Sequence, residues 1–273
     1  MTFAQRLAEA QQRFGPICVG ADPHESILRD WGLEASPAGL ASFCDILIEA
    51  FAGQVASTKP QVAFFERYGS AGMAQLERYM QAMREAGTLV IADAKRGDIG
   101  STMAGYAAAW LGDGPLAADA VTLSPYLGVD SLRPAFELAK DNDRGVFVLA
   151  VTSNPEGSQV QGSGQPAIAA HIVDELGRWN RELWPGMTGS VGAVIGATAE
   201  ARLASWGVDI DVLCGTVLAP GVGAQGAKVD QALRVGGANV TCIPLSRAIL
   251  QAGPRISDMR QVWHVWSFAK DGA

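Results

Sequence analysis

TLVIADAK, residues 88–95, begins as an apolar run and ends in charged side chains. From Leu89 to Ala92 the run is continuously apolar and does not alternate with polar residues. Strands that are buried on both faces have this composition, and they usually occur in parallel sheets. The run therefore predicts a buried parallel strand whose carboxyl end carries Asp93 and Lys95.

Seven further short runs lie on either side of the first, and most of them are also continuously apolar. They are ICVGAD (17–22), QVASTK (54–59), DAVTLS (119–124), VFVLAVTS (146–153), VGAVIGAT (191–198), TVLAPG (216–221) and NVTCIP (239–244). Helical patterns between them cover residues 37–52, 70–86, 165–182 and 224–235. About eight alternations of strand and helix in 273 residues favour a closed barrel over an open doubly wound sheet.

We therefore predict an α/β fold, a (β/α)8 TIM barrel, in which residues 1–273 form a single domain. No G-x-G-x-x-G motif follows the first run, which argues against a dinucleotide-binding fold. For the helix at 70–86, Ser70 is the expected N-cap and Gly87 the expected stop. Residues 155–166 are the most loop-like segment, and they are a candidate lid.

Composition and charge exclude several classes of partner. The chain is 48% apolar and carries a net charge of −7, so a broad surface for nucleic acid or an anionic membrane is not expected. No run approaches the roughly 20 apolar residues of a membrane span. The amino-terminal segment reads as an amphipathic helix that ends at Gly15, without the apolar core of a signal peptide. We expect a cytoplasmic protein with no nucleic-acid or membrane partner.

Cysteine and histidine spacing points away from disulfides and metals. The cysteines are Cys18, Cys44, Cys214 and Cys242, and no two of them form a C-x-x-C pair. We expect all four to be buried, reduced thiols. The histidines are His24, His171 and His264, and their spacing is not that of metal ligands. The sequence therefore predicts no metal site.

Polar and charged residues follow nearly every apolar run, where a barrel of this kind forms its active site. They are Asp22, Lys59, Asp93, Lys95, Asp98, Ser124, Thr152, Ser153, Asn154, 221–226, Ser246 and Arg247. The densest cluster contains Asp93, Lys95 and Asp98. In an extended segment residues two apart share a face, so Asp93 and Lys95 can point to the same side.

An isolated Asp-x-Lys is more often a surface ion pair than a catalytic pair. Here the preceding residues are buried in character and Lys59 ends a second strand, which favours a functional cluster. Lys59 and Lys95 could instead be Schiff-base lysines of an aldolase, a role that requires a neutral amine. Asp93 and Asp98 favour the protonated form of Lys95, which suits proton donation better than nucleophilic attack.

A second candidate site is the glycine-rich segment 219–226, APGVGAQG, which a helical pattern follows. Glycines allow backbone N–H groups to approach an anion, and a helix amino terminus adds partial positive charge. Ser246 and Arg247 at the next strand end supply a hydroxyl and a bidentate donor. A glycine-rich turn alone is often only a tight loop, but beside Arg247 it predicts a phosphate site.

These motifs resemble those of the orotidine 5′-phosphate decarboxylase family. VIADAKRGDIGST, residues 90–102, is similar to the family signature, an apolar pair followed by D-x-K-x-x-D-I and, three positions later, threonine. The longer bacterial (type 2) subgroup is resembled at GADPH (20–24), KPQVAFFE (59–66), TSNPEG (152–157), PGVGAQG (220–226) and around Arg247. Shorter members carry an aromatic-His pair where this chain has Arg96-Gly97. The resemblance covers roughly residues 15–255.

The resemblance implies a homodimeric (β/α)8 barrel that converts orotidine 5′-phosphate to UMP and CO2 without a cofactor, in the last step of UMP biosynthesis. It implies a catalytic array of Lys59, Asp93, Lys95 and a partner-contributed Asp98, in which Lys95 protonates the C6 carbanion. The substrate-binding residues that it implies are Asp22 and Thr102 at the ribose, Ser153 at the pyrimidine, and Gln225 and Arg247 at the phosphate.

Two alternatives remain. Keto-sugar-phosphate decarboxylases and hexulose-phosphate synthases share D-x-K-x-x-D but use Mg²⁺, and Lys59 stands where their metal site would need a carboxylate. The second alternative is a barrel that binds a phosphorylated ligand without turning it over. Clustered lysines and aspartates argue against it, because plain phosphate binding needs no alternating charges.

Overall fold

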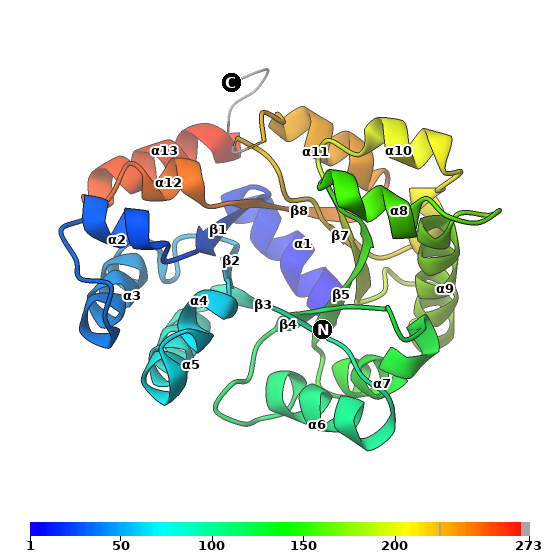
Figure 1. Ribbon diagram of the computed structural model, residues 1–273, viewed down its shortest axis with the longest axis horizontal. Coiled ribbons are helices and arrows are strands. Elements are labelled where there is room, and N and C mark those ends of the chain that lie inside the picture. Colours follow the sequence, from blue (N-terminus) through cyan, green and yellow to red (C-terminus); the bar gives the residue numbers. More distant parts are fainter. Residues whose placement is uncertain (224, 269–273) are drawn as a thin grey trace.

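The eight apolar runs form eight parallel strands that close into a barrel, shown in the computed structural model of residues 1–223 and 225–268 (Figure 1). The strands are β1 (Ile17–Ala21), β2 (Ser57–Pro60), β3 (Leu89–Arg96), β4 (Ala120–Leu123), β5 (Gly145–Val151), β6 (Val191–Ile195), β7 (Thr216–Leu218) and β8 (Val240–Leu245). Each strand pairs with the next, and β8 closes on β1 with Ile243 opposite Ile17. The predicted (β/α)8 fold is confirmed.

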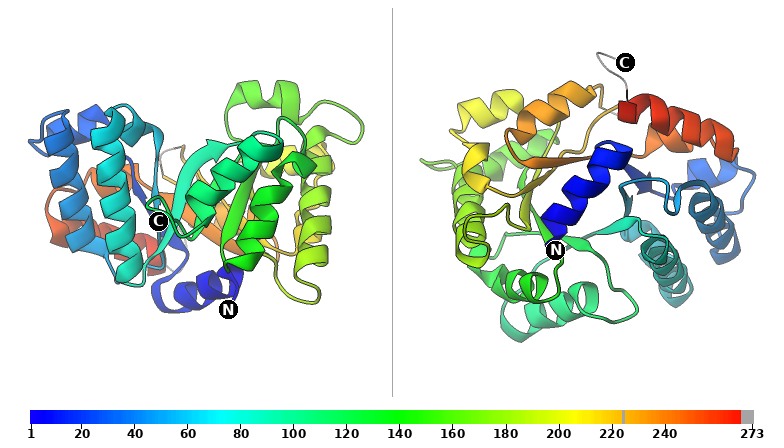
Figure 2. Two further views of the ribbon diagram at one scale, coloured as in Figure 1. Left: turned by 90° about the horizontal axis from the view of Figure 1, so that it is seen from below. Right: turned by 180° about the vertical axis from the view of Figure 1, so that it is seen from behind.

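Helices surround the strands, most of them on the outside of the barrel (Figures 1 and 2). They are α1 (Phe3–Phe14), α2 (Glu25–Asp30), α3 (Pro37–Phe51), α4 (Ala63–Glu66), α5 (Gly69–Glu85), α6 (Gly100–Leu111), α7 (Arg133–Asp141), α8 (Ser158–Gln161), α9 (Ile168–Leu183), α10 (Glu200–Ser205), α11 (Val229–Gly236), α12 (Arg247–Leu250) and α13 (Ile256–Phe268). Short 3₁₀ turns are η1 (Val129–Leu132), η2 (Pro155–Gly157) and η3 (Ile210–Leu213). A large apolar core fills the layer between strands and helices.

Helix α1 closes the amino-terminal end of the barrel, below the strands in the left view of Figure 2. A capping box of Thr2 and Gln5 starts it, and Gly15 ends it as predicted. Phe3 and Leu7 are fully buried in the barrel interior, where the Phe3 ring meets Phe147 edge-on at 5.9 Å. A Cβ on Gly145 would lie 2.2 Å from the Phe3 ring, so α1 can close the base only above a glycine.

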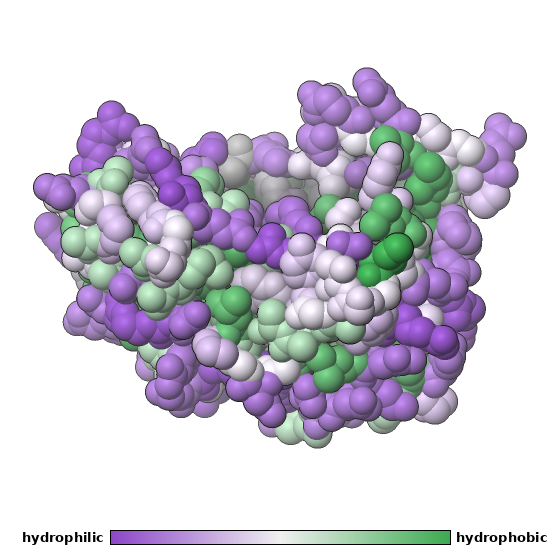
Figure 3. Space-filling view, turned by 60° about the horizontal axis from the view of Figure 1, so that its bottom comes forward, coloured by the Kyte–Doolittle hydropathy of each residue, from purple (hydrophilic) through white to green (hydrophobic). Residues whose placement is uncertain are grey.

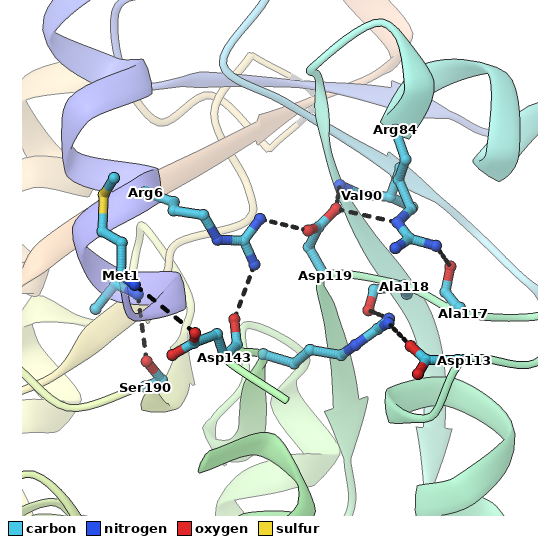
Figure 4. A network of polar contacts seen from close by, with 12 residues as sticks. Met1, Arg6, Arg84, Val90, Asp113, Ala117, Ala118, Asp119, Asp143 and Ser190 are labelled. Carbon is cyan, nitrogen blue, oxygen red and sulfur yellow. Dashed lines mark hydrogen bonds and ion pairs between the residues drawn. The ribbon is translucent and has the colours of Figure 1, made fainter. Parts of the chain in front are cut away.

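A polar network fastens α1 to the base of the barrel (Figure 4). The guanidinium of Arg6 donates to the buried carboxylate of Asp119 at 2.7 Å and to the carbonyl of Asp143 at 2.8 Å. Asp119 also accepts the backbone N–H of Val90 at 2.9 Å, and Arg84 lies 3.8 Å from it. The network therefore links α1 to β3, through Val90, and to Asp119 directly before β4.

Helix α5 begins one residue earlier than predicted, and Ser70 is not its cap. The chain passes from α4 almost directly into α5, so Tyr68 precedes the helix in a near-helical conformation that leaves no extended N-cap position. The predicted stop is confirmed. Gly87 has a φ of +86°, and the N–H groups of Gly87 and Thr88 donate to the carbonyls of Arg84 and Met83 in a Schellman motif.

Two other local predictions need correction. The helix predicted at 224–235 begins only at Val229, after Lys228, and Ala224 lies outside the described residues. The loop-like segment 155–166 contains the short helices η2 and α8. Both differences arise because glycine-rich loops can fold into tight turns before a helix starts, which composition alone does not locate.

Three of the four cysteines are buried free thiols as expected, and the fourth is not. Cys214 is exposed, and it follows η3 in a left-handed conformation with a φ of +49°. Among the described residues, no helix combines the length and apolar composition needed to cross a membrane.

Candidate functional site

Most of the predicted polar residues surround one cavity of about 590 Å³ at the carboxyl ends of the strands, whereas Asp98, Ser124 and Asn154 do not line it. Its charged and polar lining includes Asp22, Lys59, Asp93, Lys95, Ser153, Gln225 and Arg247. Leu149, Val194, Leu218 and Pro244 supply apolar surface. A concave cavity in which polar groups converge beside apolar side chains is the usual form of a small-molecule site.

Asp93 is the centre of the charged cluster. Its Oδ2 accepts from Lys59 Nζ at 2.8 Å and its Oδ1 accepts from Lys95 Nζ at 2.5 Å. Asp93 and Lys59 are buried, whereas the side chain of Lys95 is 45% exposed and lies toward the cavity. The sequence prediction that Asp93 and Lys95 share a face, with Lys59 beside them, is therefore met by the geometry.

The buried pair Asp93 and Lys59 stays charged. Burial raises the pKa of Asp93, but the ammonium groups of Lys59 and Lys95 outweigh burial and hold that pKa well below its usual range. Burial lowers the pKa of Lys59, but the carboxylates of Asp93 and Asp22 outweigh it and raise that pKa. A raised pKa opposes the neutral amine that a Schiff-base lysine needs, so this geometry disfavours the aldolase alternative for Lys59.

The backbone at Lys95 is left-handed, with a φ of +48°, which non-glycine residues seldom adopt. The pairing of β3 with β4 shifts register between Ala92 and Arg96, so the strained residue sits in a bulge. Such outliers persist where surrounding contacts enforce them, and they concentrate at functional sites.

Asp22 follows β1 at the edge of the same cavity. Its Oδ1 is buried and has no hydrogen-bond partner among the described residues. An unpaired buried carboxylate oxygen is costly, so it is suited to accept a hydrogen bond from a ligand hydroxyl.

The predicted phosphate residues lie on the β7 and β8 side of the cavity. Gly221, Gln225, Ser246 and Arg247 line it there, and Arg247 is exposed. Within 1–223 and 225–268, no carboxylate pairs with the Arg247 guanidinium. The amino terminus of α11 does not belong to this site, because that helix starts at Val229.

Ser153 lines the cavity from the segment after β5. Arg202 on α10 donates to the carbonyls on either side of it, those of Thr152 and Asn154. Gln161 on α8 binds both the N–H and the hydroxyl of Thr152 at 3.0 and 2.8 Å. The segment that carries Ser153 is therefore held from two sides.

Asp98 and Thr102 do not line the cavity of their own chain. Thr102 is exposed on α6, and the Asp98 carboxylate accepts the backbone N–H of Ile99 at 2.8 Å. The structure therefore brings seven of the nine predicted site residues together and leaves these two outside.

Two residues of the cluster were not predicted. Gln61 Nε2 donates to Asp93 Oδ2 at 2.9 Å, and the Thr122 hydroxyl donates to Asp93 Oδ1 at 2.9 Å. Gln61 could have been found, because it stands two positions after Lys59 and so shares its face. Thr122 lies inside its apolar run, where no sequence signal distinguishes a functional hydroxyl from a structural one.

No group of three or more His, Cys, Asp or Glu residues in the described part of the chain could hold a metal ion. A second cavity of about 590 Å³ lies at the amino-terminal ends of β6 to β8, lined by Arg181, Met187, Asp211 and Cys214 among others. The charged residues that line this second cavity, Arg181 and Asp211, are exposed, unlike the buried Asp93 and Lys59 of the first.

Comparisons with known proteins agree with the fold and with the family that the sequence resembles. The model of the orotidine 5′-phosphate decarboxylase / HUMPS family matches residues 15–262. An orotidine 5′-phosphate decarboxylase of Corynebacterium glutamicum is 49% identical, over 100% of this chain and 97% of the relative. A Streptomyces avermitilis crystal structure superimposes with a TM-score of 0.89 at 47% identity, covering 97% of this chain and 93% of that one. The Leishmania donovani OMP decarboxylase structure gives 0.77 at 30% identity, covering 99% and 100%.

Proposed function

Because the chain belongs to the orotidine 5′-phosphate decarboxylase / HUMPS family, we propose that it is a carboxy-lyase that converts orotidine 5′-phosphate to UMP and CO2. This is the last step of UMP biosynthesis, and we place it in the cytoplasm. The observation that carries the proposal is the buried Asp93 carboxylate between Lys59 and Lys95, at the floor of a cavity with Arg247 on its rim.

In the proposed reaction, the bond between C6 of the pyrimidine and its carboxylate breaks, and the electron pair stays on C6. CO2 leaves, and Lys95 Nζ donates a proton to C6. A preorganised cation stabilises the developing carbanion before it transfers the proton. Lys95 then takes a proton from water, to which its side chain is 45% exposed.

Asp93 and Lys59 set the electrostatics of this step. The depressed pKa of Asp93 keeps it a carboxylate at neutral pH, so it repels the substrate carboxylate that approaches it. Lys59 offsets part of the buried negative charge and fixes the direction of Asp93. As CO2 leaves, the negative charge of the substrate carboxylate passes to C6, which Lys95 then protonates. The repulsion by Asp93 at the carboxylate position therefore falls as the reaction proceeds.

The binding residues would hold the rest of the substrate. Asp22 Oδ1 lacks a partner among the described residues and would accept a ribose hydroxyl. Ser153 would bind the pyrimidine, and Gln225 and Arg247 would bind the phosphate. Binding energy from the remote phosphate can then be used at the reacting carbon.

We propose a homodimer in which Asp98 and Thr102 complete the partner's cavity. Both lie outside their own cavity, and apolar side chains beside them are exposed, with Ile99 61% and Tyr126 83% accessible. Leu127 adds to this surface after β4. Figure 3 shows the molecule with its α6 side turned toward the viewer. On this face, apolar side chains gather in patches among hydrophilic ones. A second copy that covered this surface would bring two further polar groups to each site.

A magnesium-dependent keto-sugar-phosphate enzyme of the same family fits less well. Both oxygens of Asp93 already accept from ammonium groups, so a divalent cation there would meet two positive charges at close range. The donor set supports chemistry by the protein's own residues.

The deciding experiment follows the absorbance of orotidine 5′-phosphate with purified protein, with and without EDTA. We expect turnover to UMP that EDTA leaves unchanged. Absence of turnover would contradict the proposal, and activity only on a hexulose phosphate with Mg²⁺ would replace it with the alternative.

A further inference from the structure

Thr122 lies in β4 at the junction of the charged cluster and the bulge in β3. Its side chain is almost completely buried, and it lines the cavity floor beside Asp93. The hydroxyl lies 2.9 Å from Asp93 Oδ1 and 2.9 Å from the backbone nitrogen of Lys95. A single hydroxyl therefore touches both residues on which the proposed chemistry depends.

The direction of both hydrogen bonds is fixed by their partners. The backbone nitrogen of Lys95 can only donate, so the Thr122 oxygen accepts there. The carboxylate of Asp93 stays ionised and can only accept, so the single hydroxyl proton of Thr122 points at Oδ1. Valine, which has the same shape, can make neither contact.

The contact with the backbone explains how the bulge is held. Between Ala92 and Arg96 the ladder of β3 with β4 is broken, and Lys95 has a left-handed φ of +48°. Its N–H donates to the Thr122 side chain in place of a carbonyl of the neighbouring strand. The hydroxyl thus supplies the partner for the partly buried Lys95 N–H in this strained conformation.

The contact with the carboxylate completes a regular arrangement around Asp93. Each carboxylate oxygen accepts from one ammonium and one neutral donor: Oδ1 from Lys95 and Thr122, Oδ2 from Lys59 and Gln61. Among the described residues, the side chain of Gln61 bonds only to the Asp93 carboxylate, whereas the Thr122 hydroxyl also accepts the backbone N–H of Lys95. It is the residue that couples the position of the carboxylate to that of the ammonium.

We propose that Thr122 is a positioning residue of the decarboxylation site, which fixes the Lys95 ammonium relative to the Asp93 carboxylate. The inference rests on the proposed function. It predicts that losing the hydroxyl lowers the rate of the chemical step, while ground-state binding through the ribose and phosphate contacts is largely retained.

The test compares Thr122→Val, which removes the hydroxyl, with Thr122→Ser, which keeps it. For Thr122→Val we expect kcat for orotidine 5′-phosphate to fall at least tenfold while KM changes less than threefold. Thr122→Ser should keep at least a third of wild-type kcat. If the valine variant does not fold, judged by its circular dichroism and melting, Thr122→Ala takes its place against the same serine variant.

Thr58→Val is the matched control. Thr58 is a buried threonine of the neighbouring strand β2, and its hydroxyl bonds to the carbonyl of Val19 and the hydroxyl of Tyr79, not to the charged cluster. We expect this variant to melt at a lower temperature with kcat within twofold of wild type. An equal loss of kcat in Thr58→Val, or a serine variant as inactive as the valine one, would overturn the positioning role.

A second measurement separates this inference from the proposed function. Amide hydrogen exchange at Lys95 should be protected in the wild type and in Thr122→Ser, and faster in Thr122→Val than in Thr58→Val. This readout does not need the substrate. Unchanged exchange would contradict the role of Thr122, whereas a wild type without decarboxylase activity would contradict only the proposed reaction.

Discussion

At the scale of single residues, Asp93 determines how the site responds to pH. Its pKa in the folded protein lies below the value of about 3.9 expected in the unfolded chain. Its stabilising contribution is therefore fully present above that value and is lost as pH falls toward the folded pKa. Lys59 has the opposite sign, since its raised pKa stabilises the fold below about pH 10.4 and loses that effect at higher pH.

We predict that the free energy of unfolding falls as pH drops below about 4, in part because Asp93 must be protonated. Asp93→Asn should be less stable at pH 7, because Lys59 would lose its buried counter-charge. It should also show a weaker pH dependence in the acid range. Urea unfolding at pH 3 to 7 measures both, with Asp45→Asn, an exposed carboxylate on α3, as the control. An identical acid slope in the Asp93 variant and the wild type would refute this assignment.

The proton-donor role of Lys95 gives a second prediction. Lys95→Ala should lower kcat by a factor of about 100 or more, the range for loss of a general acid. The variant should stay folded and still bind UMP, which isothermal calorimetry can measure. Lys140→Ala, at an exposed position near the end of α7, should keep wild-type kcat. If Lys95→Ala retains a tenth of the wild-type kcat, another group protonates C6.

At the scale of elements, the segment after β5 depends on α10. Arg202→Ala removes the charged donor that spans Ser153, and hydrogen bonds from charged groups typically contribute about 1.5–3 kcal/mol. We expect kcat/KM to fall about tenfold and limited proteolysis within residues 152–161 to become faster. Arg181→Ala is the control. It removes a similar contact, to the carbonyl of Val212 in η3, and should leave kcat/KM unchanged. Equal effects of the two substitutions would show that Arg202 has no special role.

Elements also show what the sequence could and could not predict. Most of the strands can be predicted because a strand buried on both faces has no polar side to interrupt the apolar run, as in TLVIADAK. Helix α6 was not singled out, since its run of Ala107, Ala108 and Ala109 gives little contrast between its faces. Residue propensity favours Ser70 as a cap, because propensity contains no information on how α4 leads directly into α5.

The same distinction, between what the sequence can and cannot predict, applies to the residues of the site. Residues that follow strands, such as Lys59 and Arg247, were predicted because parallel strands bring their carboxyl ends together. Thr122 was missed because its role depends on the register shift between β3 and β4 and on the φ of Lys95. Neither can be recognised in one sequence without the paired strand.

At the scale of the whole molecule, the proposed dimer makes a prediction about mixed subunits. Lys95→Ala and Asp98→Asn homodimers should each be nearly inactive. When the two exchange subunits, half of the dimers are mixed, and each mixed dimer has one site with both substitutions and one with neither. Activity should then rise to about a quarter of the wild-type value, with exchange followed by native mass spectrometry.

Mixing Lys95→Ala with Asp93→Asn is the matched control. Both side chains belong to the cavity of their own chain, so every site in the mixed dimer remains damaged and activity should not return. No recovery in the Asp98 mixture, or full activity of Asp98→Asn alone, would remove Asp98 from the partner's site.

Closure of the barrel base by α1 also governs how molecules enter and leave. Phe3, Leu7 and Phe147 fill the interior below the charged cluster, so the cavity opens on the carboxyl side of the barrel. Substrate and products must therefore share one entrance. In the proposed reaction UMP occupies that entrance until it dissociates, so no new substrate can reach Lys95 beforehand. The helix that seals one end of the barrel thereby makes product departure at the other end a condition for every new turnover.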